Sequence, residues 1–201
     1  MLIIGLLMLG FVPVLAGQVR LVELLLGIEI IEVNARFSVQ PFPVVVHIIT
    51  ASLYAWVGAF QFSSTLRRKA PGWHLAAGRV LVLSGLLLAF SGLWMSVVHV
   101  SETDGPVLMF FRLIVSAGMI VALVLGVWAI MRRQIEQHRA WMLRAYALAM
   151  GAGTQVFTLT LGVLMIGTLS AATTAWLMGA GWIINVLVAE WIVRDKWSVK
   201  A

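Results

Sequence analysis

Residues 107–131 read VLMFFRLIVSAGMIVALVLGVWAIM, and Arg112 is the only charged residue among them. As an α-helix rising about 1.5 Å per residue, this stretch is longer than the roughly 30 Å of hydrocarbon in a bilayer. Lipid offers no hydrogen-bond partners to peptide groups, so a helix is the form in which a single segment crosses it. The stretch therefore predicts a transmembrane helix.

Five more apolar runs flank this segment. Short polar or helix-breaking stretches, such as Arg67–Gly72 and Ser101–Pro106, separate them. The runs cover about residues 2–19, 43–63, 75–100, 140–167 and 173–193. Because the connections between most of them are short, the sequence predicts an all-α fold, a bundle of six transmembrane helices.

The composition agrees with a membrane protein. Of the 201 residues, 62% are hydrophobic and 11% are charged, and the mean hydropathy is +1.02, whereas soluble domains are about half apolar and a quarter charged. The chain has no cysteine, which excludes disulfides, thiolate catalysis, iron–sulfur clusters and cysteine-ligated zinc.

The formal net charge of +6 indicates topology rather than nucleic-acid binding. Most lysines and arginines fall in the second–third connection, the fourth–fifth connection and the tail, with only Arg20, Arg36 and Arg112 on the other side. The positive-inside rule then places both termini in the cytoplasm. We expect a multi-pass protein of the cytoplasmic (inner) membrane of a bacterium.

We expect two parts in the chain. Residues 1–42 would hold the first span and an outer amphipathic linker, and residues 43–201 a five-span bundle with a short cytoplasmic tail. In the linker, an apolar helix face would lie on the membrane while Glu23, Glu29 and Glu32 point to water. An irregular link without a helix is the alternative.

The four histidines are the candidate metal ligands. His47 and His99 fall toward the outer side, whereas His74 and His138 lie at the inner boundary, where the third and fifth spans begin. Neutral imidazole is an axial ligand of haem, and a helical bundle can hold a cofactor between facing helices. We predict haem b ligation by His74 and His138, with His47 and His99 as the alternative pair; simple hydrogen bonding at the boundary is the competing interpretation.

Three arginines accompany the inner histidines. Arg79, Arg139 and Arg144 lie near the inner ends of the third and fifth spans. A guanidinium there needs an anionic partner, such as a haem propionate, a lipid phosphate, an acidic substrate or a glutamate, unless it reaches the interface. These residues predict an anion-binding shell, with interfacial anchoring as the alternative.

Four other polar residues fall inside predicted spans: Gln61, Gln155, Asn185 and Glu190. Helix packing is the simplest role for the amides, because they hydrogen-bond between helices, and a pocket-lining role is the alternative. Glu190 has three candidate partners, one on its own helix and two on other helices. Arg194 has the favourable i,i+4 spacing on the same helix, and Arg79 or Arg144 would be reached across the bundle.

Several of these residues occur in a familiar order. The chain resembles a prokaryotic membrane-protein family known as domain of unknown function 2306 over roughly residues 43–194. The resemblance rests on His47, Gly58-Ala59-Phe60-Gln61-Phe62, Arg67, His74-x-x-x-Gly78-Arg79, His138-Arg139-x-Trp141-Met142-x-Arg144 and Asn185-Val186-Leu187-Val188-Ala189-Glu190-Trp191. Two positions depart from the family pattern: Leu75 follows His74 where an arginine is usual, and an arginine of the fifth span is replaced near Gln155.

The resemblance implies a helical bundle broadly like cytochrome b561-type proteins and implies no activity. Our leading hypothesis is a b-type haem protein that passes electrons between a quinol or a partner protein and an acceptor. A haem-free protein that binds or transports an anionic lipid or metabolite is the alternative. A third hypothesis is an accessory subunit, or a homo-oligomer, that packs through its small residues.

Overall fold

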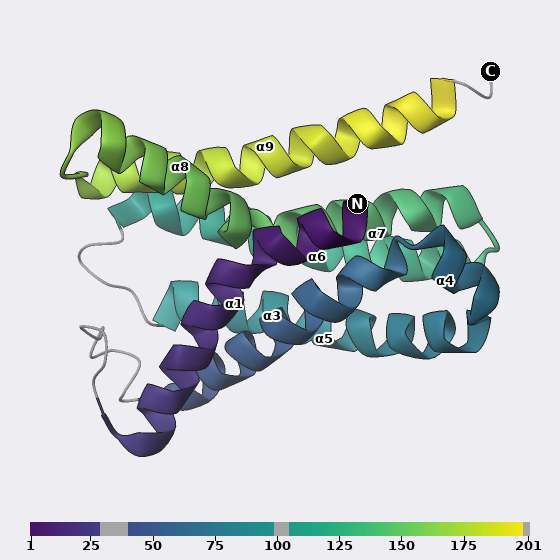
Figure 1. Cartoon of the computed structure of the whole chain (residues 1–201), viewed down its shortest axis with the longest axis horizontal. Helices are drawn as coiled ribbons and strands as arrows, with labels where there is room; N and C mark the ends of the chain where they lie inside the picture. Colours follow the sequence, from purple (N-terminus) through teal and green to yellow (C-terminus); the bar gives the residue numbers. More distant parts are fainter. Residues whose placement is uncertain (29–39, 99–104, 199–201) are drawn as a thin grey trace.

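The computed structural model describes residues 1–28, 40–98 and 105–198, and for residues 196–198 it describes the backbone only. The described residues are almost entirely helical and contain no strand. The helices are α1 (Leu2–Leu26), α3 (Pro41–Gln61), α4 (Ser64–Lys69), α5 (Pro71–Val98), α6 (Gly105–Met131), α7 (Ile135–Ala149), α8 (Gly151–Ile166) and α9 (Ala171–Ser198) (Figure 1).

The predicted membrane bundle is confirmed. Among the described residues, the helices α1, α3, α5, α6 and α9 are each long and apolar enough to cross a bilayer. The bent pair α7 and α8 passes the same test together, which gives six spans when the pair is counted as one. Which side of the membrane each end faces stays a prediction.

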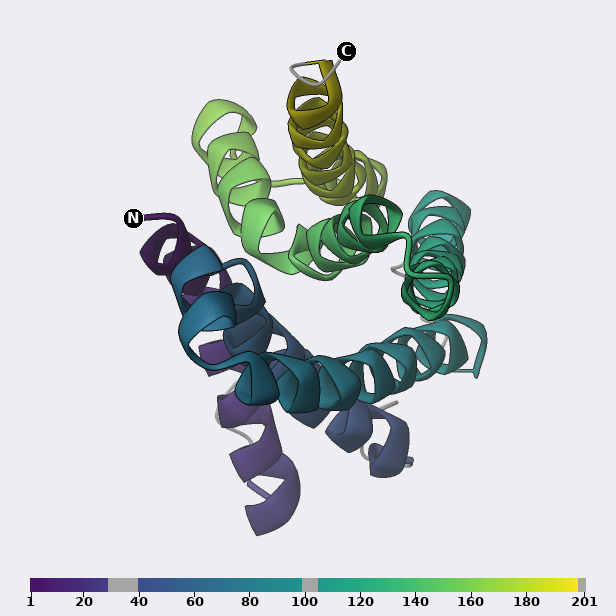
Figure 2. The ribbon, with the colours of Figure 1, turned by 90° about the vertical axis from the view of Figure 1, so that its right-hand side faces the viewer.

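The helices close into a ring of contacts (Figure 2). α3 packs on α1 and α5, α5 on α6, and α6 on both α7 and α9. α9 lies against α8, and α8 returns to α1. As a result, α1, α3 and α5 form one side of the bundle and α6 to α9 form the other.

Aromatic and apolar side chains fill the space between the two sides. Tyr54 of α3 and Tyr146 of α7 have ring centroids 6.0 Å apart, and the Tyr146 hydroxyl donates to the Ala55 carbonyl at 2.8 Å. Leu88 and Leu123 are buried in the same cluster. Large apolar side chains also cover the outside, for example Leu83 and Leu187, each more than 60% exposed. Such a surface is stable in lipid and unstable in water.

The fifth span differs from the prediction of a continuous helix over residues 140–167. α7 and α8 meet at Met150 with a bend of 42°. A Cβ on Gly151 would overlap the indole of Trp182 in α9, so the glycine lets α9 lie close to the break. Helix ends leave carbonyls without partners. Asn185 Nδ2 donates to one of them, the Ala147 carbonyl, at 3.1 Å.

The first span also extends further than predicted. α1 continues to Leu26, so residues 20–26 belong to the first helix and do not begin a separate surface helix. Glu23 was expected to face water, yet it is 4% exposed and pairs with Arg20 at 3.0 Å. A carboxylate inside an apolar bundle requires such a partner. The remaining linker positions Glu29 and Glu32 lie outside the described residues.

Close packing of α8 against α1 yields a first prediction. A Cβ on Gly153 would overlap the backbone carbonyl of Leu9, which cannot rotate away, whereas a Cβ on Gly5 would meet nothing. We expect Gly153→Ala to lower the free energy of unfolding by about 1–3 kcal/mol. Gly5→Ala, the matched control, should be neutral or slightly stabilising. Thermal unfolding in detergent measures both; equal stability of the two variants would contradict this packing.

Candidate functional site

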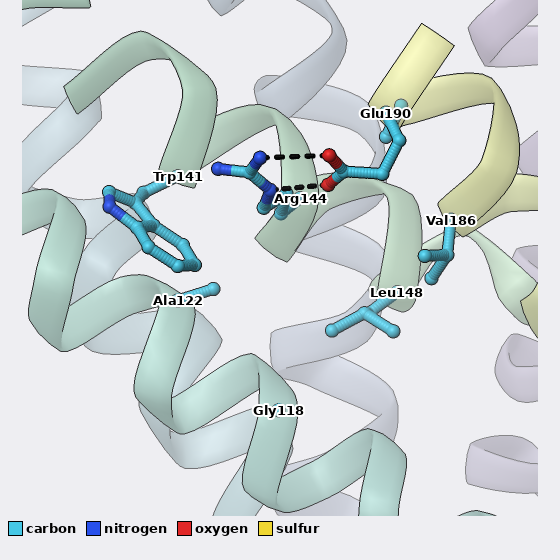
Figure 3. A pocket seen from close by; sticks show the side chains of 8 residues that line it. Gly118, Ala122, Trp141, Arg144, Leu148, Val186 and Glu190 are labelled. Carbon is cyan, nitrogen blue, oxygen red and sulfur yellow. Dashed lines mark hydrogen bonds and ion pairs between the residues drawn. The ribbon is translucent and has the colours of Figure 1, made fainter. Parts of the chain in front are cut away.

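An ion pair joins α7 and α9 inside the bundle. Arg144 Nε lies 2.5 Å from Glu190 Oε1, and Nη2 lies 2.9 Å from Oε2 (Figure 3). The Arg144 guanidinium also lies over the Trp141 ring, 4.6 Å from its centroid. Glu190 therefore pairs with Arg144, one of the partners predicted across the bundle. A bidentate pair in an apolar setting neutralises both charges and orients both helices.

A small pocket lies beside this ion pair, and we call it the lateral pocket. Its volume is about 130 Å³, and it is lined by Gly118, Ala122, Trp141, Arg144, Leu148, Val186, Ala189 and Glu190 (Figure 3). The small side chains at Gly118, Ala122 and Ala189 leave the space, and the ion pair forms one polar wall. A second recess, lined by Pro106, Val107, Phe110, Phe111 and Trp176, is entirely apolar in its lining residues.

His138 lies at the start of α7, near the end of the bundle that holds α4 (Figure 1). Its Nδ1 is 2.9 Å from the carbonyl oxygen of Gly126 in α6. A carbonyl only accepts, so Nδ1 carries a proton and donates it. In the neutral ring this leaves the lone pair of Nε2 available for a ligand.

Three more polar residues lie at this end, and with His138 we call them the basic-end cluster: Gln61, Arg67 and His74. Arg67 and His138 lie close enough to His74 to interact with it electrostatically. The Gln61 side chain reaches α5, where it packs beside Gly78. Its Nε2 is buried and has no hydrogen-bond partner among the described residues. A buried amide donor without an acceptor is energetically costly.

The sequence of α4 explains how Arg67 reaches the cluster. This connection was expected as a plain loop, but Ser63 caps a short helix by accepting a hydrogen bond from the Leu66 N–H at 3.1 Å. The helix turns Arg67 inward, where it is half-buried, and leaves Arg68 exposed. Neighbouring arginines thus have different surroundings.

Of the outer histidine pair, the structure describes His47. His47 is on α3, and its Nδ1 lies 3.1 Å from the Ser91 hydroxyl of α5. Because Ser91 donates its single proton to the Leu88 carbonyl, the histidine is the donor. His47 therefore joins α3 to α5. His99 lies outside the described residues, so the alternative pair stays a prediction.

The three predicted arginines do not gather at one place. Arg79 is exposed on α5, and Arg139 forms an exposed pair with Glu136 at 3.5 Å. Arg144 is committed to Glu190. The amides differ as well: Gln155 donates to the Met178 carbonyl at 3.0 Å, and Asn185 accepts from Thr154 at 2.7 Å. Gln155 and Asn185 thus serve helix packing, whereas Gln61 is left with an unused donor.

Sequence reasoning missed the two tyrosines of the core. They are the only tyrosines in the chain, and each lies inside a span, which is the signal that could have found them. They fill the centre of the bundle between α3 and α7. Within the described ranges, no group of three or more metal-ligating side chains gathers, and neither recess is lined by a histidine.

The Arg144–Glu190 pair yields a second prediction. Arg144→Met leaves a carboxylate without its partner among apolar side chains, so we expect a loss of about 3 kcal/mol in unfolding free energy. Glu190→Leu should cost a similar amount. The double variant should recover much of either loss because no charge is left unpaired.

A double-mutant cycle of unfolding in detergent measures this coupling. Arg139→Met is the matched control, since its exposed pair with Glu136 should contribute less than about 1 kcal/mol. Strictly additive losses at positions 144 and 190 would show that the two side chains are not coupled.

Comparison with known proteins identifies a family. A family model described as a predicted membrane protein, DUF2306, matches residues 44–193, from α3 through α9. Neither the curated proteins nor the solved structures provide a match. The matched region contains the basic-end cluster, the lateral pocket and the residues on which the sequence resemblance rests. This chain belongs to the DUF2306 family of membrane proteins.

Proposed function

We propose that the basic-end cluster binds the anionic group of a membrane lipid or metabolite, and that the protein is a membrane binding or transport protein. The buried Gln61 amide, whose Nε2 has no acceptor among the described residues, carries this proposal. An ionised phosphate or carboxylate would supply that acceptor. Arg67 and His74 lie at the same end and add a positive charge and a ring that can donate.

The charges at this end support an anion rather than a cation. None of the four side chains in the cluster is acidic. Glu136, the acidic residue in the first turn of α7, is bound by Arg139. Ligand oxygens would therefore meet hydrogen-bond donors and a guanidinium, and a positively charged ligand would be repelled.

Neighbouring arginines provide the test. Arg67→Gln and Arg68→Gln change the net charge equally, but only Arg67 lies close to His74. We expect Arg67→Gln and Gln61→Leu to weaken binding by about tenfold, the value of a hydrogen bond to a charged group. Arg68→Gln should bind almost as the unmodified protein does.

Two binding measurements separate the sources of the anion. Phosphatidylglycerol and phosphatidylcholine, added to the detergent-solubilised protein, are counted by native mass spectrometry, and glycerol 3-phosphate is tested by calorimetry. Preference for phosphatidylglycerol assigns a lipid headgroup, and binding of glycerol 3-phosphate a soluble metabolite. Equal effects of the substitutions at positions 67 and 68 would mean general attraction by the surface and would refute the site.

A second candidate function is binding of a b-type haem for electron transfer with a quinol or a partner protein. His138 favours it, because a histidine that ligates a metal holds its other ring N–H on a carbonyl or carboxylate, as Nδ1 does with Gly126. His74 would be the second axial ligand. Arg79 and Arg139 would be left for the propionates, since Arg144 is bound by Glu190. A bound haem would supply a one-electron carrier.

An absorption spectrum tests this second candidate. We expect the purified protein, reduced with dithionite, to show the bands of a b-type haem, and His74→Ala and His138→Ala to lose them. His47→Ala should keep them, because His47 is held between α3 and α5. A colourless protein that also fails to take up added hemin would remove the haem candidate and leave the anion site standing.

A further inference from the structure

We propose that the lateral pocket binds a neutral, lipid-soluble ring with carbonyl oxygens, the chemical class of the quinones. The pocket is built from α6, α7 and α9 and shares no residue with the basic-end cluster. Val186 on its rim is 36% exposed on the apolar outer surface. A ligand dissolved in the bilayer would therefore enter from the side.

The size of the pocket selects a ring or a short chain. Its volume of about 130 Å³ is that of roughly four water molecules. Pockets for drug-sized ligands are several times larger. A single six-membered ring fits, with its hydrocarbon tail left in the lipid, whereas a macrocycle is excluded without movement of the helices.

The polar wall offers hydrogen-bond donors to such a ring. A guanidinium has five N–H groups, and Glu190 engages Nε and Nη2 of Arg144. Nη1 makes no hydrogen bond to any described residue. In Figure 3 this third nitrogen points away from Glu190, toward the side of Trp141. A ligand carbonyl can accept from Nη1 while the ring packs on the Trp141 indole.

Charge distinguishes a quinone from a lipid phosphate at this place. Arg144 and Glu190 form a neutral pair, and both line the pocket. A phosphate accepting from Nη1 would lie a few ångströms from the Glu190 carboxylate, and the two anions would repel strongly in an apolar medium. A neutral carbonyl pays no such cost. The site therefore fits an uncharged ring better than an anionic headgroup.

The experiment uses a photoreactive azido-quinone with the full-length protein in phosphatidylcholine nanodiscs, and mass spectrometry maps the labelled peptides. We expect labelling of the segments that hold Trp141 and Val186. Val186→Phe places a ring across the rim and should lower the affinity by about tenfold. Val188→Phe, on the same helix but outside the pocket, is the matched control and should leave labelling unchanged.

A second variant that fills part of the pocket guards against the case in which Val186→Phe disturbs folding. A Cβ on Gly118 would lie 3.4 Å from the Leu148 side chain, so Gly118→Ala adds a methyl group to the pocket without a clash. It should also weaken labelling by about tenfold. Equal labelling of the Val186→Phe, Gly118→Ala and Val188→Phe proteins would overturn the proposal.

Competition by phosphatidylglycerol tests the charge argument. It should not displace the azido-quinone from the unmodified protein, and it should do so from Glu190→Gln, in which Arg144 keeps an uncompensated charge. Displacement from the unmodified protein would assign the pocket to a lipid headgroup and overturn the quinone. Because Arg67→Gln removes none of the lining residues, it should leave labelling unchanged even though it weakens the proposed anion binding.

Discussion

An arginine side chain inside a lipid-facing helix needs a counter-charge, and this requirement organises the α7 to α9 half of the bundle. Arg144 lies more than two turns into α7, where water cannot solvate it fully. Glu190 of α9 meets it with two parallel hydrogen bonds. Neither helix can rotate or slide without breaking a charged contact in an apolar medium. The pair thereby holds α9 at a set distance from α6 and leaves the lateral pocket between them.

The break at Met150, between α7 and α8, is stabilised by a glycine and an asparagine. A bent span exposes carbonyls that lipid cannot satisfy. Asn185 donates to the Ala147 carbonyl, and the missing side chain of Gly151 lets Trp182 cover the bend. Asn185 and Glu190 are both on α9. This one helix therefore supplies a hydrogen-bond donor to a free carbonyl of α7 and a counter-charge to the arginine of α7. This explains why an otherwise apolar helix carries these two polar residues.

Some of the site was predictable from residue type, and some was not. Hydropathy located the spans, because the thickness of a bilayer sets the length of a crossing helix, but it ended the first span seven residues before Leu26. Glu190 had a partner on its own helix and partners across the bundle, and spacing alone could not choose between them. The break at Met150 was missed because Gly-Ala-Gly is equally compatible with close packing of a straight helix. The inward turn of Arg67 depends on the cap at Ser63, which the sequence analysis had placed at the end of the second span.

The amino-acid sequence by itself determined that the chain is a multi-span helical membrane protein and which polar residues lie inside it, because hydrophobic burial and backbone hydrogen bonding in lipid are properties of each segment alone. Only the tertiary structure decided which of those residues meet. Arg144 pairs with Glu190, and His138 donates to the Gly126 carbonyl, whereas the Gln61 amide nitrogen at the basic end has no acceptor among the residues that the structure describes. These pairings depend on how the helices rotate and cross, which is settled by packing between segments distant in the sequence.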